Sequence, residues 1–161
     1  MSRLWDKGDA FDEVIERFTV GRDPELDTQL VPFDVLGSAA HAKMLASVGL
    51  LTRDEEAEIN RELRAIAADA RAGTFRIERS EEDGHTAIER RLTNRLGNVG
   101  KKIHSGRSRN DQVIAAIRLH GREALLGIAI EVCRTAEVLA RLAEDTREVS
   151  MPGYTHTRQA M

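Results

Sequence analysis

The longest uninterrupted helical pattern of the 161-residue chain covers about residues 110–147 and contains no proline. Along it, large aliphatic side chains recur at roughly the 3.6-residue repeat of an α-helix. They are Ile114, Ile117, Leu125, Ile128, Val132, Leu139 and Leu142. Such a helix is roughly 55 Å long at 1.5 Å per residue, whereas helices of globular proteins usually have about 8–20 residues. The pattern therefore predicts a helical bundle or a coiled coil.

The apolar face of this segment is wider than a single stripe. Further large apolar residues lie beside the stripe, among them Leu119, Leu126, Ile130 and Val138. A helix that is apolar on several sides has to be surrounded by other elements. Because the helices expected upstream are too short to cover it, we expect partner helices from sequence outside this chain, from other subunits, or from both.

Shorter helical patterns precede the long one, and glycine and proline separate them. Residues 19–33 contain Gly21, Pro24 and Pro32 and are expected to form an irregular connector, as are residues 74–79. Four helices are expected before the long one. The first starts near Asp9, and the second covers about residues 34–48. The third runs from a capping box at Thr52 and Glu55 to Gly73, and the fourth from about Asp83 to Leu96. These patterns predict an all-α fold, with a small N-terminal helical domain over residues 1–109 and the start of a central helical bundle over residues 110–161.

Composition excludes several classes of function. The 24 basic and 27 acidic side chains give a net charge of −3, which provides no drive toward nucleic acid or anionic membranes. No apolar run reaches the roughly 20 residues of a membrane span. Cys133 is the only cysteine, so an intrachain disulfide and a cysteine-based zinc site are excluded, and its apolar neighbours predict an unreactive, buried thiol. We expect a cytoplasmic protein that binds neither nucleic acid nor membrane.

A cationic stretch precedes the long helix. Residues 97–110 read GNVGKKIHSGRSRN and contain four Lys or Arg residues and no acid. Ser108 and Asn110 add neutral hydrogen-bond donors, Gly106 lets the backbone approach a ligand closely, and the N-terminus of a helix favours anions. The stretch thus predicts a carboxylate or phosphate site. The alternative is a solvated basic loop in which Ser108 or Asp111 simply caps the helix.

Two further segments carry groups that could take part in chemistry. His156 follows Thr155 just past the Pro152–Gly153 bend, and a histidine can transfer a proton near neutral pH, although a lone histidine is more often an ordinary surface residue. Asp83 either caps a helix or contributes to a site. His85 and Glu89 share one helix face, but two ligands are weak evidence for a metal site. We therefore expect no metal and no cofactor.

Three motifs occur in a characteristic order: EDGHTAIE at Glu82–Glu89, KIHSGRSRNDQV at Lys102–Val113, and PGYTH at Pro152–His156. With Leu4–Trp5, Asp34–Ala42 and Gly49–Thr52, they resemble the argininosuccinate lyase family of the fumarase/aspartase superfamily over essentially the whole chain. The resemblance implies the reversible β-elimination of argininosuccinate to arginine and fumarate, a step of arginine biosynthesis.

The resemblance also implies roles for individual residues. His156 matches the general acid/base histidine, and Asp83 and His85 match a segment that lines the same pocket. Thr19 is the hydroxyl nearest to the place where relatives have a substrate-binding serine. Ser108, Arg109 and Asn110 would bind substrate carboxylates, and Thr155 would bind the succinyl part. Such donors and cations stabilise the charge that builds up on a carboxylate when the adjacent carbon loses a proton.

The family's assembly is a homotetramer in which three subunits build each active site, and its catalytic serine lies on a mobile loop beyond position 161. We therefore expect this chain to be the N-terminal portion of a longer enzyme and to be inactive alone. The alternative is a non-catalytic helical assembly or binding protein that keeps the lyase scaffold. Nucleic-acid binding through residues 101–109 is disfavoured because the basic cluster is one short loop and aromatic residues are scarce.

Overall fold

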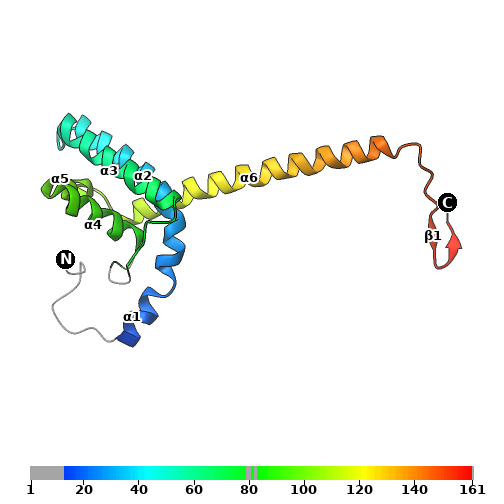
Figure 1. The fold of residues 1–161 in the computed structure, drawn as a ribbon, viewed down its shortest axis with the longest axis horizontal. Helices are drawn as coiled ribbons and strands as arrows, with labels where there is room; N and C mark the ends of the chain where they lie inside the picture. Colours follow the sequence, from blue (N-terminus) through cyan, green and yellow to red (C-terminus); the bar gives the residue numbers. More distant parts are fainter. Residues whose placement is uncertain (1–12, 79–80, 82, 161) are drawn as a thin grey trace. The chain divides into compact units, whose positions relative to one another are not determined.

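A computed structural model describes residues 13–78, 81 and 83–160 (Figure 1). The chain divides into two compact units, Met1–His120 and Gly121–Met161. Regular structure in the described residues is almost entirely helical, which confirms the all-α prediction. The elements are α1 (Glu13–Val20), α2 (Asp23–Ser47), α3 (Arg53–Arg71), α4 (Gly84–Leu96), α5 (Asn98–Lys101), the 3₁₀ helix η2 (Lys102–His104), α6 (Arg109–Asp145), β1 (Tyr154–Thr155) and β2 (Arg158–Gln159).

Helix α2 begins eleven residues earlier than the expected start at 34, so the prediction of an irregular connector over residues 19–33 is wrong for most of that segment. Pro24 lies in the first turn of the helix. Backbone N–H groups there have no partner within the helix, so the lack of an N–H in proline removes no hydrogen bond. Pro32 lies inside the helix and costs about 3 kcal/mol there. Val31 and Val35 on either side are buried, and their burial offsets that cost because each contributes about 1.5–3 kcal/mol.

The ends of the other helices agree with the local signals in the sequence. Thr52 and Glu55 form the predicted capping box of α3, in which each side chain accepts from the backbone N–H of the other residue. Gly49 has a φ of +80° and follows α2, while the N–H of Leu50 reaches back to the Leu45 carbonyl. This arrangement is a Schellman motif, and it ends the helix at the predicted place. The predicted start of α1 near Asp9 lies outside the described residues.

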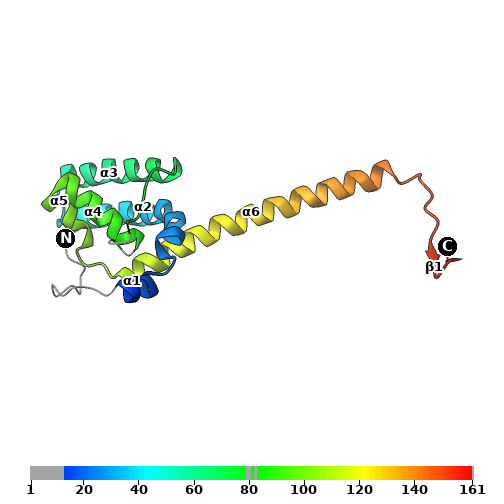
Figure 2. The same cartoon turned by 60° about the horizontal axis from the view of Figure 1, so that its bottom comes forward.

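The core of the first unit lies where α2, α3 and α4 pack side by side (Figure 2). Its largest fully buried aliphatic side chains are Val31, Leu45, Ile59, Leu63, Ile66 and Leu92. The cationic stretch between α4 and α6 is more ordered than predicted, because α5 and η2 occupy residues 98–104. Gly100 contacts the end of α4 so closely that a Cβ atom there would lie 2.3 Å from the carbonyl oxygen of Leu92.

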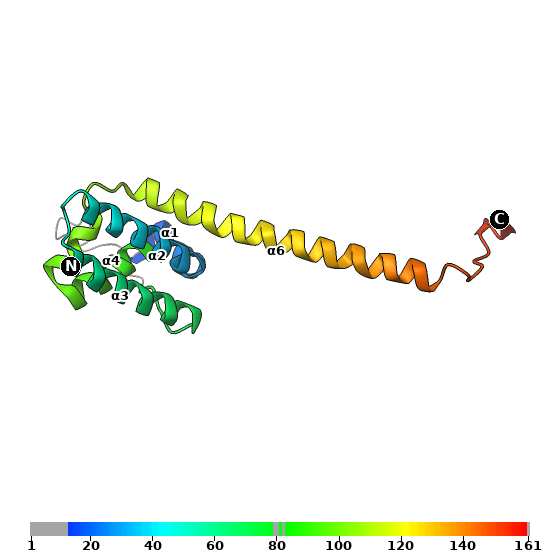
Figure 3. The same cartoon turned by 90° about the horizontal axis from the view of Figure 1, so that it is seen from above.

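Helix α6 is continuous over 37 residues, which confirms the predicted long helix (Figure 3). Its first part belongs to the first unit, where Gln112 and Ala116 are buried. Beyond residue 120 its large apolar side chains are exposed, among them Leu125, Ile128, Ile130, Val132 and Leu139. Cys133 is also exposed, so the prediction of a buried thiol is wrong for this chain. The cause is that, among the described residues of the second unit, Cys133 and its apolar neighbours on α6 are exposed.

Beyond α6, strands β1 and β2 form a two-stranded antiparallel hairpin in which Tyr154 pairs with Gln159. His156 and Thr157 form its turn, with φ values of 50° and 67°. The sequence predicted a bend here but no strands. The described part of the chain contains no helix with the length and apolar character that a membrane crossing requires.

Candidate functional site

The structure brings two of the predicted motifs together where α4 and α6 begin. The Arg109 guanidinium Nη1 donates to Asp83 Oδ2 at 2.9 Å and to Asp83 Oδ1 at 3.2 Å. The same nitrogen donates to the Thr86 hydroxyl at 2.9 Å, and Nη2 lies 3.9 Å from Glu89 Oε2. Arg109 Nε is buried and has no hydrogen-bond partner among the described residues. Arg109 is therefore held against α4 through Asp83 and Thr86.

Asp83 has a second contact that is purely structural. Its Oδ1 accepts from the Thr86 backbone N–H at 2.7 Å, so Asp83 is the N-cap of α4. The sequence analysis left a helix cap and a site residue open as alternatives. The geometry makes Asp83 the cap and also places its carboxylate against Arg109, so the two alternatives are compatible.

Ser108 and Asn110 lie on either side of Arg109 at the start of α6. The Asn110 backbone N–H donates to Ser108 Oγ at 3.3 Å, so Ser108 caps the helix as the sequence suggested. Gly106, two residues earlier, has a φ of +63°. That left-handed conformation favours glycine because it has no Cβ atom, and it turns the chain into the helix. The free N–H groups at this helix start favour an anion.

His85 points into the interior rather than toward solvent. Its Nδ1 lies 2.5 Å from Asp34 Oδ2, and both side chains are more than nine-tenths buried. Burial is the largest influence on the pKa of His85 and lowers it. The hydrogen bond and charge of Asp34, together with the charges of Asp83 and Asp27, outweigh burial, so the pKa of His85 is raised above its ordinary value.

Asp34 is the centre of a wider polar cluster. Gln112 Nε2 donates to both of its oxygens, at 2.8 and 3.0 Å, and Ser38 Oγ donates to Oδ1 at 3.3 Å. Arg107 Nη1 donates to Ser38 Oγ at 2.8 Å, and Arg107 Nη2 lies 3.7 Å from Asp34 Oδ1. One buried carboxylate on α2 thus contacts α4, the loop before α6 and the first turn of α6.

Sequence reasoning assigned no role to Asp34 and Asp27. Asp27 Oδ2 accepts from the Gly84 backbone N–H at 2.9 Å, next to Asp83. Burial, opposed by that hydrogen bond and by His85, raises the pKa of Asp27. A signal did exist in the sequence. Asp27 and Asp34 are seven residues apart on the same helix face as Val31 and Val35, and a carboxylate at a core position is unusual unless it has partners.

The remaining predicted residues lie elsewhere in the chain. Thr19 is on α1, and its hydroxyl donates to the Ile15 carbonyl at 2.9 Å. Thr155 and His156 belong to the hairpin of the second unit, where Thr155 Oγ1 lies 3.1 Å from His156 Nδ1. Four of the eight predicted site residues therefore lie together in the first unit. Asp83 contacts Arg109, and Ser108 and Asn110 are the chain neighbours of Arg109.

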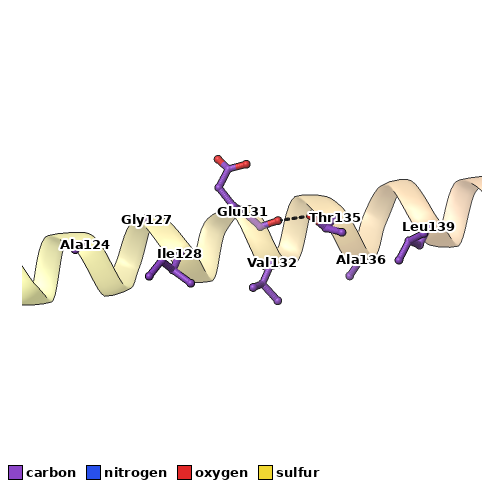
Figure 4. A pocket seen from close by; sticks show the side chains of 8 residues that line it. All are labelled: Ala124, Gly127, Ile128, Glu131, Val132, Thr135, Ala136 and Leu139. Atoms are coloured by element: carbon purple, nitrogen blue, oxygen red, sulfur yellow. Dashed lines mark hydrogen bonds between the residues drawn. The ribbon is translucent and has the colours of Figure 1, made fainter.

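The hollows of the two units differ in character. In the first unit, a small polar cavity lies beside the Asp34 cluster, and its lining includes Ser38, His85, Glu89, His104 and Arg107. In the second unit, eight residues of α6 line a shallow apolar hollow (Figure 4), and they are Ala124, Gly127, Ile128, Glu131, Val132, Thr135, Ala136 and Leu139. Within the described ranges, no group of three or more His, Cys, Asp or Glu residues is arranged to hold a metal ion.

Comparison with known proteins decides the family. A family model described as a lyase matches residues 8–161. The chain belongs to this lyase family. The motifs at Glu82–Glu89, Lys102–Val113 and Pro152–His156 therefore lie in a lyase sequence, and the resemblance inferred from them is confirmed.

Relatives in the lyase family carry a more specific name. Over 159 residues the chain is 51% identical to an argininosuccinate lyase of Bacteroides fragilis and 50% identical to one of Bacteroides thetaiotaomicron. It is 44% identical over 159 residues to an argininosuccinate lyase of Sorangium cellulosum. Each match covers 99% of this chain but only 36–37% of the relative. The chain therefore spans a little more than a third of the length of these curated relatives.

Proposed function

We propose that this chain is part of an argininosuccinate lyase, which cleaves argininosuccinate reversibly to arginine and fumarate. The observation that supports this best is the junction of α4 and α6, where Arg109, Ser108 and Asn110 surround a helix N-terminus. A substrate rich in carboxylates fits such a site. The relatives named argininosuccinate lyase, about 50% identical over nearly the whole chain, support this particular substrate.

The chemistry explains the residue types. β-Elimination removes a proton from a carbon next to a carboxylate, and negative charge then builds up on that carboxylate. Fixed donors and cations stabilise the charge. Ser108, Arg109 and Asn110 would supply them. Asp83 pairs with Arg109 and keeps its guanidinium in place.

We assign proton transfer to His156, because a histidine titrates near neutral pH and can act as both acid and base. Thr155 would bind the succinyl part of the substrate, and Asp83, His85 and Thr19 would contribute to the same pocket. The reaction needs no cofactor in this proposal. The substrate is a small molecule, and the cytoplasm is the compartment that suits a biosynthetic lyase with one cysteine.

The proposed assembly is a homotetramer whose subunits share active sites, so that the residues of the first unit meet His156 of another subunit. The exposed apolar residues of α6 support an assembly. Leu125, Ile128, Val132 and Leu139 are all more than half exposed in this chain. A helix with such a surface gains stability when other helices cover it, at about 25 cal/mol for each Å² removed from water.

A chimera tests the proposal. This chain replaces the matched 159 residues of the Bacteroides fragilis relative, and the release of fumarate is followed by its ultraviolet absorbance. We expect turnover of argininosuccinate by the chimera and no turnover by the 161-residue chain alone. A chimera that assembles normally but never releases fumarate would contradict the proposal and favour the non-catalytic scaffold. Turnover by the chain alone would show that the rest of the enzyme is dispensable.

A pair of histidine variants tests the assignment of the acid/base group. His156→Asn in the chimera should lower kcat by about 10²–10⁴, which is the usual effect of losing acid/base assistance. His120→Asn is the matched control, because His120 packs edge-to-face against Phe33 and is not part of the proposed site. An equal loss in both variants, or none in His156→Asn, would remove His156 from the mechanism.

A further inference from the structure

We propose that Asp34 is a positioning residue that sets the tautomer of His85 and fixes both ends of the segment 107–112. This inference rests on the proposed function for its effect on catalysis, but its structural part stands independently. Asp34 is 2% exposed and lies on α2, outside the three motifs that identify the chain.

A buried carboxylate is stable only when its oxygens have partners. At Asp34, Oδ2 faces His85 Nδ1 at 2.5 Å, and both oxygens accept from Gln112 Nε2. An ionised carboxylate can only accept hydrogen bonds, so His85 must carry its proton on Nδ1. In its neutral form His85 then has an unprotonated Nε2, and in its charged form both nitrogens donate.

Acidic groups lie near His85 on both α2 and α4. On α2, Asp34 and Asp27 are acidic, and on its own helix Asp83 and Glu89 are acidic. The opposing charge is Arg107, with His104 next to it, both of which share the small cavity with His85. Gln112 of α6 is neutral and donates to Asp34. The pKa of His85 is raised by Asp34, Asp83 and Asp27 in spite of its burial.

The same carboxylate also holds the segment that contains Ser108, Arg109 and Asn110. Arg107 precedes these residues and meets Asp34 through Ser38, while Gln112 follows them and donates to Asp34 directly. The Arg107 guanidinium lies near Gly37, and its Nη2 would lie 3.4 Å from a Cβ at that position, which is an ordinary van der Waals distance. Both ends of the proposed anion-binding turn are therefore attached to one point on α2, which orients the turn before any ligand binds.

The first test observes the tautomer of His85 directly. Long-range ¹H–¹⁵N spectra of the labelled 161-residue chain report which nitrogen of His85 carries the proton above its pKa. We expect the Nδ1–H tautomer. The Nε2–H tautomer, or two tautomers in rapid exchange, would overturn the proposal, because Asp34 would then not accept from His85. The His85→Gln variant identifies the signal by its loss.

The second test compares two Asp→Asn variants. Asp34→Asn removes the charge at His85, and we expect the pKa of His85 to shift downward and its tautomer preference to weaken. Asp69→Asn removes an equally charged group that pairs with Arg91 at 2.7 Å in the same unit, and it should leave the His85 signals unchanged. Equal shifts in both variants, or none in Asp34→Asn, would refute the role of Asp34.

The third test separates this inference from the proposed function. In the chimera, Asp34→Asn should lower kcat/KM roughly 100-fold and move a limb of its pH profile, because a misplaced binding turn costs about that factor. Ser38→Ala, which leaves the His85 contact, should leave that limb in place. An active chimera whose pH profile ignores Asp34→Asn would refute the positioning role alone. An inactive chimera with the expected His85 tautomer would refute the lyase proposal alone.

Discussion

The pKa values of two histidines of the first unit are shifted in opposite directions. The pKa of His85 is raised, because Asp34 and its acidic neighbours outweigh burial. The pKa of His41 is lowered by burial and by the charges of Arg107 and His104, although its Nε2 lies 3.0 Å from the Ser105 carbonyl oxygen. The folded chain therefore favours the charged form of His85 and the neutral form of His41.

These directions predict how stability varies with pH. The contribution of His85 is complete below its ordinary pKa of 6.5 and is lost as the pH rises through its raised pKa. The contribution of His41 is complete above 6.5 and is lost as the pH falls toward its lowered pKa. We expect the melting temperature, followed by circular dichroism, to have a maximum near that value.

Variants assign each side of the maximum to one histidine. His41→Asn should flatten the acidic side, and His85→Asn, which keeps a donor for Asp34, should flatten the alkaline side. The measurements should stay above about pH 5, so that carboxylates with ordinary pKa values remain ionised throughout. If the two variants follow the same curve as the original chain, the electrostatic explanation is wrong.

At the scale of elements, the packing of α5 against α4 depends on one glycine. A Cβ on Gly100 would lie 2.3 Å from the Leu92 carbonyl oxygen and 2.7 Å from the Thr93 backbone nitrogen. Both atoms belong to the backbone of α4, so no side chain can move aside to make room. The close approach places η2 and the cationic loop next to α2, where Ile103 joins the core.

Gly100→Ala should therefore destabilise the chain by about 3 kcal/mol or more, as expected for overpacking against a rigid backbone. Gly121→Ala is the matched control, because it lies inside α6 with no atom within 4 Å of the added Cβ. That substitution should stabilise the helix by up to about 1 kcal/mol. Urea unfolding measures both, and a Gly100→Ala variant as stable as the original chain would contradict the close contact.

At the scale of the whole molecule, the main feature is the exposed apolar surface of α6 beyond residue 120. Apolar residues line two separate hollows on this helix, one around Ile128 and Val132 and the other around Leu126, Ile130 and Cys133. Exposed apolar surface of this extent favours association. Two such faces on one helix fit a helix that is surrounded in the assembled protein.

We expect Ile128→Asp to weaken the assembly of the chimera, measured by sedimentation velocity, because it places a charge in the apolar hollow. Ala143→Asp introduces the same charge on α6 outside both hollows and should leave the assembly intact.

Cys133 adds an independent measurement. Its thiol should react readily with a disulfide reagent in the isolated chain and at least about tenfold more slowly in the assembly. Equal reactivity in both would show that this face stays open.

The sequence alone determined the limits of α3, α4 and α6 and the end of α2, because the signals are local. The capping box at Thr52 and Glu55, the cap at Asp83 and the glycine at position 49 each act within one turn of the chain. The repeat of apolar residues likewise predicted α6 as one helix. Local signals failed at the start of α2, where prolines indicate a break and the burial of Val31 and Val35 outweighs them.

Only the tertiary structure decided which residues meet. Asp34 and His85 are 51 positions apart, and Arg109 and Asp83 are 26 positions apart. No periodicity connects such positions. Their pairing follows from packing, because helices that bury their apolar faces also bring polar groups out of water, and those groups remain only where they find partners. The motifs therefore revealed the residues of the candidate site, while the fold of the first unit revealed the carboxylate that holds them.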